Sequence, residues 1–206
     1  MKMRTIISII FLGISNLILS QGIPTEIKKT VGFIYAKDKL GKVNPQGTGF
    51  FVSVSDSING ELRGAIYFVT AKHVLKQGNA YRDTILIRLN KRDSISEYGR
   101  VELYPNGKNK NVFIHPDKTV DIAVLPIGPD PMKYDYLALP STYLTNKKSF
   151  KELNIREGSD VFFTGLFTPF VGSKRIYPIV RFGRVALLTW LFRSYDATIF
   201  GQIAPL

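Results

Sequence analysis

The stretch Phe68-Val69-Thr70-Ala71-Lys72-His73-Val74 decides the fold, because an apolar run ends here in a polar turn. The run starts near Leu62, and residues 65–69 are apolar throughout. A short apolar run bounded by turn residues is typical of a strand that is packed on both faces. The sequence therefore predicts a strand over 62–70 and a short helical turn over 71–75, with His73 where the chain turns.

Similar short runs lie on both sides of this stretch, and no long helical pattern separates them. Several short strands with turn residues between them are typical of a small antiparallel barrel. The run Gly128-Pro129-Asp130-Pro131 ends the series, and a polar stretch follows it. The other predicted strands cover residues 31–36, 47–54, 84–89, 100–103, 111–114, 122–127, 161–167, 176–180 and 184–190.

We therefore expect an all-β protein with two antiparallel barrels of the six-stranded type, the second of them incomplete. Only three or four strands fit after the polar stretch, which is too few for a second barrel of equal size. The expected parts are a signal peptide (1–20), a first barrel (23–128), a connection (129–157) and a partial second barrel (158–206).

The first twenty residues have the pattern of a secretory signal peptide. Lys2 and Arg4 are followed by a mostly apolar run that ends at the small residue Ser20. The alternative is an uncleaved membrane anchor, but the run is short and contains Asn16, whereas a spanning helix needs about 20 apolar residues. We expect a secreted or periplasmic protein with no membrane span after signal cleavage.

Composition limits the classes of function. Hydrophobic residues make up 45% of the 206 residues and charged residues 21%, as in a globular protein. The chain has no cysteine and only two histidines, so a zinc site is not expected.

The formal net charge is +12, but no stripe or stacking motif organises the basic residues, so we expect a basic solvated surface and no specific nucleic-acid binding.

A second motif, Asp121-Ile122-Ala123-Val124-Leu125, places an aspartate at the start of another apolar strand. A carboxylate in this position is unfavourable unless it has a partner. A histidine followed later by an aspartate forms two thirds of a Ser-His-Asp triad, in which the aspartate orients the basic histidine. Either residue alone is more often structural, and we assign His115 that role. The joint pattern with Gly47-Thr48-Gly49-Phe50, each motif at a strand edge, favours His73 and Asp121 as site residues.

Together these motifs resemble the trypsin-like (chymotrypsin-fold) serine peptidases, especially cysteine-free bacterial ones, over residues 31–185. Residues 158–165 resemble the segment that opens the second barrel of the family, and residues 181–185 resemble a later strand of that barrel. The resemblance implies hydrolysis of a protein or peptide substrate without a metal or organic cofactor. It also implies that His73 is the general base and Asp121 its orienting acid.

The family's nucleophile lies in a Gly-x-Ser-Gly turn whose backbone N–H groups also stabilise the oxyanion. None of the serines after Asp121 has that glycine context. We therefore expect a chain that is truncated before its nucleophile or a dedicated inactive homologue, and no hydrolysis in either case. The serines that follow Asp121 are Ser141, Ser149, Ser159, Ser173 and Ser194.

Two rival functions stay open. One is a non-catalytic secreted binding module that keeps the barrel and holds a protein or peptide ligand. The other is a basic envelope-associated protein without protease ancestry. The sequence predicts neither the substrate preference nor the oligomeric state.

Overall fold

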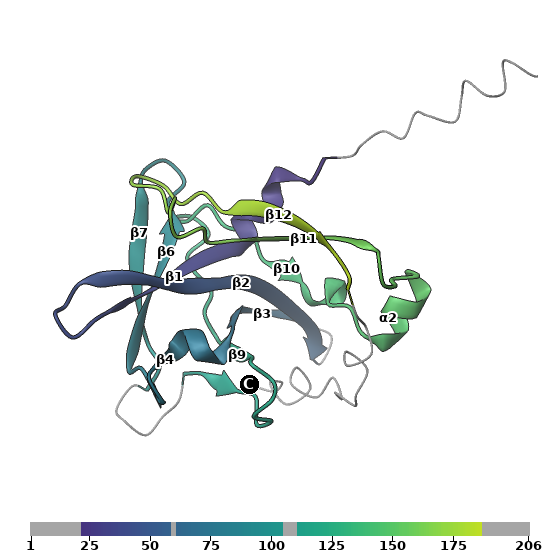
Figure 1. The fold of residues 1–206 in the computed structure, drawn as a ribbon, viewed down its shortest axis with the longest axis horizontal. Coiled ribbons are helices and arrows are strands. Elements are labelled where there is room, and N and C mark those ends of the chain that lie inside the picture. The colour runs from purple at the N-terminus through teal and green to yellow at the C-terminus, as the bar shows by residue number, and fades with distance from the viewer. Residues whose placement is uncertain (1–21, 59–60, 105–110, 187–206) are drawn as a thin grey trace, which may run out of the picture.

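A computed structural model describes residues 22–58, 61–104 and 111–186. The predicted signal segment and Ser194 lie outside the described residues. Strands dominate this part of the chain, and its helices are short, so the prediction of an all-β fold is confirmed (Figure 1). The helical segments are η1 (Thr25–Thr30), η2 (Lys72–Leu75), η4 (Ser141–Tyr143) and α2 (Lys147–Glu152).

An eight-stranded sheet forms the centre of the described chain. Its pairing order is β7-β6-β1-β2-β3-β9-β8, and β10 pairs with β2 in parallel. The strands are β1 (Val31–Lys37), β2 (Val43–Ile58), β3 (Glu61–Thr70), β6 (Thr84–Asn90), β7 (Ser96–Glu102), β8 (Phe113–Ile114), β9 (Ala123–Leu125) and β10 (Leu139–Pro140).

The central part of this order is a Greek key. Strands β1, β2 and β3 follow one another as antiparallel neighbours, and β6 returns to pair with the free side of β1. The order β6-β1-β2-β3 is the arrangement that defines the Greek key motif. The predicted strands over 31–36, 47–54, 62–70 and 84–89 are therefore confirmed as four consecutive members of one sheet.

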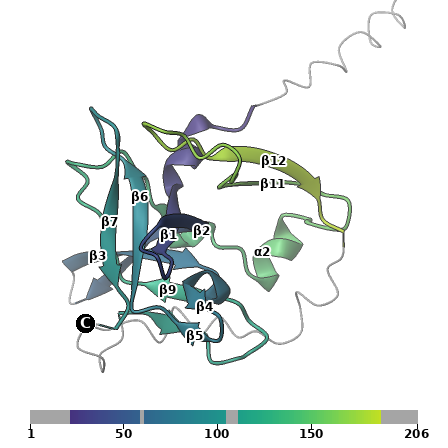
Figure 2. The same cartoon turned by 60° about the vertical axis from the view of Figure 1, so that its left-hand side comes forward.

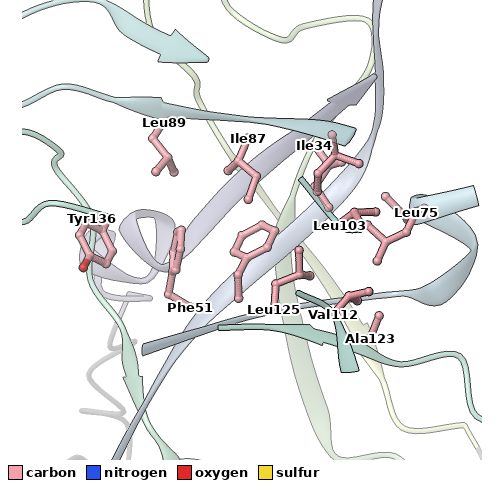
Figure 3. Close-up of a cluster of buried hydrophobic side chains, with 13 residues drawn as sticks. Ile34, Phe51, Leu75, Ile87, Leu89, Leu103, Val112, Ala123, Leu125 and Tyr136 are labelled. Carbon is pink, nitrogen blue, oxygen red and sulfur yellow. The ribbon is translucent and has the colours of Figure 1, made fainter. Parts of the chain in front are cut away.

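The apolar run at the end of β3, residues 67–69, has both of its faces covered. Phe68 is fully buried in one cluster with Phe51, whereas its neighbours Tyr67 and Val69 are buried in a second cluster with Val52. Successive side chains of a strand point to opposite faces, so a strand between two cores needs no polar face. Figure 3 shows the larger cluster, in which side chains from several strands meet Leu75 of η2 and Tyr136.

Two further pairs of strands complete the described fold. Strands β11 (Asp160–Gly165) and β12 (Ile179–Arg184) form an antiparallel hairpin that lies beside β1 and β2 (Figures 1 and 2). The segment between them places Ile176 against Val31 and Phe33 of β1, so the outer face of β1 is also buried. The other pair is β4 (Lys76–Gln77) with β5 (Ala80–Tyr81).

The structure corrects the predicted strands near the end of the described chain. A single strand, β12, replaces the predicted strands over 176–180 and 184–190, of which residues 187–190 lie outside the described residues. Pro178 has no N–H to donate to a ladder. The backbone N–H of Ile176 instead donates to Oδ1 of Asn90, at 2.8 Å. The strand therefore begins only after the proline.

The predicted connection over 129–157 contains more structure than its polar sequence indicated. Its strand β10 joins the main sheet, and α2 is capped by Asn146, whose side chain accepts hydrogen bonds from two backbone N–H groups. In the part of the chain that the structure describes, the main sheet has β7 and β8 as its ends and does not close by strand pairing. The division into two barrels at these boundaries stays a prediction. No helix within the described ranges has the length and apolar character needed to cross a membrane.

Candidate functional site

The pairing of β3 with β9 brings the two predicted site residues to one end of the sheet. Thr70, the last residue of β3, pairs with Ala123, the first residue of β9. His73 follows Thr70 by one turn, and Asp121 precedes Ala123 by two residues. Because the two strands are antiparallel, the end of one meets the start of the other, so register alone places both residues together.

The prediction that the His73 ring and the Asp121 carboxylate lie within hydrogen-bond reach is confirmed. Nδ1 of the ring is hydrogen bonded to Oδ2 of the carboxylate. The backbone N–H of His73 donates to the other oxygen, Oδ1, at 3.0 Å. Both oxygens of Asp121 are therefore bound to the same residue, which fixes the imidazole plane relative to its own backbone.

This arrangement assigns the tautomer of the ring. An ionised carboxylate can only accept, so the proton of the hydrogen bond lies on Nδ1. Burial raises the pKa of Asp121, but the hydrogen bonds and charge of His73 outweigh it and hold that pKa below its ordinary value of 3.8. Asp121 is then ionised at neutral pH, and in the neutral form of the imidazole the lone pair lies on Nε2. The His73 side chain is 72% exposed, so this lone pair is open to a substrate or solvent.

The turn that carries His73 is anchored by its apolar neighbours. Val74 and Leu75 of η2 are buried, and Leu75 belongs to the larger core cluster. At the end of β3, the hydroxyl of Thr70 donates to the backbone carbonyl of Thr48 on β2, at 2.9 Å. The predicted helical turn over 71–75 is thus confirmed as η2, with its apolar side in the core and His73 in solvent.

Lys72 is a site residue that the sequence analysis missed. Its side chain is buried, and its ammonium donates to the backbone carbonyls of Asp117, at 2.8 Å, and His115, at 3.3 Å. These carbonyls belong to the loop that carries Asp121. A buried lysine must have partners for its charge, so Lys72 holds this loop against the end of β3. The available signal was a lysine directly between an apolar strand and His73.

The same loop is also stabilised from within. The Asp117 carboxylate accepts hydrogen bonds from the backbone N–H and the hydroxyl of Thr119, at 2.8 and 2.7 Å. The ring of His115 accepts from the backbone N–H of Asp117, at 3.1 Å, which agrees with the structural role predicted for this histidine. The position of Asp121 is therefore set by a turn with its own hydrogen bonds as well as by Lys72.

Two of the described serines that follow Asp121 use their hydroxyls in contacts away from His73. Ser149 belongs to the capping box of α2, and the hydroxyl of Ser159 accepts from the backbone N–H of Arg156, at 3.0 Å. Ser141 lies in η4, and the carbonyl of Ser173 accepts from Arg88. Within the described ranges, His73 has no hydrogen bond to a serine hydroxyl, so the structure brings together two of the three groups of a triad.

No protein-family model matches this chain, and no curated protein matches its sequence. Among the residues the structure describes, no three histidine or acidic side chains gather in a way that could hold a metal ion. The His73–Asp121 pair is therefore the candidate functional site.

Proposed function

We propose that this chain is a homologue of the trypsin-like serine endopeptidases, in which His73 is the general base and Asp121 its orienting acid. The observation that supports the proposal is the double contact of the Asp121 carboxylate with His73, which turns Nδ1 toward Asp121 and leaves Nε2 free of that contact on an exposed side chain. A base oriented in this way can take the proton of a serine hydroxyl as its oxygen attacks a peptide carbonyl. Asp121 would then stabilise the imidazolium that forms.

The two-barrel architecture belongs to the same proposal. The Greek key order β6-β1-β2-β3, with β9 on the other side of β3, supports a first barrel whose site lies at the β3–β9 end. The β11–β12 hairpin, which lies beside β1 and β2, supports the beginning of a second barrel. A cleft between two such units would receive the exposed Nε2 of His73.

Hydrolysis also needs a nucleophile, and no serine of the 206 residues lies in a Gly-x-Ser-Gly turn. Without that turn, the site would lack both the hydroxyl and the backbone donors that stabilise the oxyanion. We therefore expect no peptide hydrolysis by the chain of 206 residues. We also expect no labelling by a fluorophosphonate probe, which reacts with activated serines.

The decisive experiment compares this chain with one extended through any Gly-x-Ser-Gly segment encoded after the Leu206 codon. The extended protein should be labelled by the probe, and His73→Ala should abolish the labelling. If a folded, extended protein is not labelled, His73 is not a working base. If the shorter chain is labelled and His73→Ala removes the label, the nucleophile is a serine dismissed above, and Ser194 and Ser173 would be tested first.

A non-catalytic binding module on the same fold is the second candidate. It is favoured by Ser149 and Ser159, whose hydroxyls are engaged in contacts away from His73. The discriminating observation is the nucleotide sequence after the Leu206 codon. A stretch that encodes Gly-x-Ser-Gly in any frame favours the peptidase, whereas its absence favours the binding module.

A further inference from the structure

A hollow of about 490 Å³ lies where the end of β1, the β4–β5 pair and the β6–β7 pair meet. Figure 2 shows β4 and β5 beside the lower ends of β6 and β7. The volume of the hollow falls in the range of about 300–1,000 Å³ that is usual for small-molecule sites. His73 and Asp121 do not line it. Its wall includes Lys37, Gln77, Tyr81, Arg82, Leu86 and Arg100.

The guanidinium of Arg82 has only neutral partners. It donates to Oε1 of Gln77 at 3.1 Å, to Oε1 of Gln46 at 3.3 Å, and to the backbone carbonyl of Lys37 at 3.4 Å. Its Nε is buried and has no hydrogen-bond partner. Among the described residues, no carboxylate forms an ion pair with it. A partly buried guanidinium held by three long bonds to neutral oxygens keeps its charge uncompensated.

Other cations surround the same hollow. Lys37 and Arg100 lie in its wall, and the ammonium of Lys76 is 5.1 Å from the centroid of the Tyr81 ring. Two carboxylates act against them: Asp83 lines the hollow, and Glu102 pairs with Arg100 at 3.2 Å. Cations outnumber carboxylates here, and the Nε of Arg82 is buried. The local charge favours an anion.

The wall also has an apolar and aromatic part beside its charged residues and the polar Gln77 and Thr84. Ala36, Ala80 and Leu86 contribute aliphatic surface, and Tyr81 contributes a ring. Sites for organic ligands commonly combine such a wall with a few polar groups that fix orientation. A planar guanidinium suits a carboxylate or a phosphate, because its donors match two oxygens at once.

We infer that this hollow binds a small organic anion, with its carboxylate or phosphate group at Arg82 and its apolar body against Tyr81 and Leu86. Lys37 and Arg100 add attraction at the rim. This inference is independent of the His73–Asp121 site and goes beyond the function proposed for it.

Isothermal titration at about 0.15 M salt would test the site with three probes: phenyl phosphate, benzoate and inorganic phosphate. At this ionic strength, charges on a solvated surface are screened beyond about 8 Å. At least one organic probe should bind about tenfold more tightly than inorganic phosphate, because only the organic probes bury an apolar body. The stronger of the two identifies the preferred anionic group.

Variants then assign the binding to this hollow. Arg82→Gln should weaken the better probe by roughly tenfold or more, as expected for a lost charged hydrogen bond. Arg100→Gln removes a charge from an exposed side chain at the rim of the hollow. It should weaken binding of the better probe less than Arg82→Gln does. Lys174→Gln removes an equal charge from an exposed lysine that does not line the hollow, and it should leave binding unchanged. His73→Ala should also leave it unchanged, which separates this test from that of the proposed function.

The inference is overturned if neither organic probe binds at millimolar concentration. It is also overturned if inorganic phosphate binds as tightly as both organic probes, or if Lys174→Gln weakens binding as much as Arg100→Gln does. Because Arg82 links β1, β2 and the β4–β5 pair, its variant could fail to fold. In that case the test rests on Arg100→Gln, because the Arg100 side chain is 68% exposed and its replacement should leave the fold intact. Arg100→Gln should then weaken binding of the better probe, and Lys174→Gln should not.

Discussion

The ammonium of Lys72 lies 2.8 Å from the backbone carbonyl oxygen of Asp117, so a buried cation joins the end of β3 to the loop that carries Asp121. Neither residue is itself part of the His73–Asp121 pair. Their contact nevertheless determines where the Asp121 carboxylate lies, because Asp117 and Asp121 belong to the same short loop.

Lys72→Met should therefore destabilise the protein and loosen the pair. The methionine fills the buried space but donates nothing to the carbonyls of His115 and Asp117. We expect the free energy of unfolding to fall by about 1.5–3 kcal/mol, the usual range for hydrogen bonds to a charged group. Urea denaturation measures this change. Lys118→Met, an exposed lysine of the same loop, is the control and should change stability by less than about 0.5 kcal/mol. Equal effects of the two variants would contradict the anchoring role of Lys72.

The titration of Asp121 should reflect its hydrogen bonds to His73. We expect the midpoint of the Asp121 carboxyl group, followed by carbon-detected NMR, to lie below 3.8, because the hydrogen bonds of His73 outweigh burial. His73→Ala removes the ring and should move the midpoint upward, whereas His115→Ala should move it less. A midpoint above 3.8 in the wild type would mean that burial dominates.

The same lowered pKa predicts how stability depends on pH. The folded pKa of Asp121 lies below its unfolded value, so the unfolded state binds the proton more readily. The stabilisation from ionised Asp121 is fully present above the unfolded pKa and is lost as pH falls through the folded pKa. The difference in urea midpoint between wild type and Asp121→Asn should therefore be constant near neutral pH and shrink below about pH 4. A difference that does not change between pH 6 and pH 3 would contradict this linkage.

Arg88 should not tolerate replacement by lysine. It is buried, and its guanidinium donates to the carbonyls of Gly172 and Ser173, each at 2.8 Å, and through Nε to the hydroxyl of Ser96, also at 2.8 Å. A lysine ammonium cannot reproduce this planar arrangement of donors. We expect Arg88→Lys to lower the free energy of unfolding by about 1–3 kcal/mol. Arg156→Lys, at an exposed position between α2 and β11, should change it by less than about 0.5 kcal/mol.

Gly49 of β2 lies against Phe68 and Val69 of β3, and it should not accept a side chain. A Cβ there would overlap the Phe68 ring and lie 2.8 Å from the carbonyl oxygen of Val69. Gly49→Ala should therefore destabilise the protein by about 1–3 kcal/mol, as overpacked sites usually do. Gly64 is in the same strand pair, but its nearest neighbours would be 3.9 Å away, so Gly64→Ala should be tolerated. Thermal denaturation of both variants distinguishes the two sites.

The strands around the site could be predicted because each is a continuous apolar run with a polar boundary. The proximity of His73 and Asp121 followed from those boundaries, since antiparallel pairing joins the end of one strand to the start of the other. Lys72 could not be assigned in the same way, because its partners are backbone carbonyls, which leave no signature in the sequence. The start of β12 was also missed, since it depends on a contact between Ile176 and the distant Asn90. Helix α2 did have a local signal in Asn146, but the polar composition around it suggested a plain connection.

The order of strands also has a kinetic consequence. Strand β9 pairs with β3 although the β6–β7 hairpin and β8 lie between the two in the sequence. Sheets built from such distant pairings fold slowly, typically in milliseconds to seconds, because loop closure precedes any gain from contact. The contact between His73 and Asp121 therefore depends on closing a loop of 48 residues. Until β9 pairs with β3, the Asp121 carboxylate is not held against Nδ1, so the signal of the Nδ1 proton reports on that pairing.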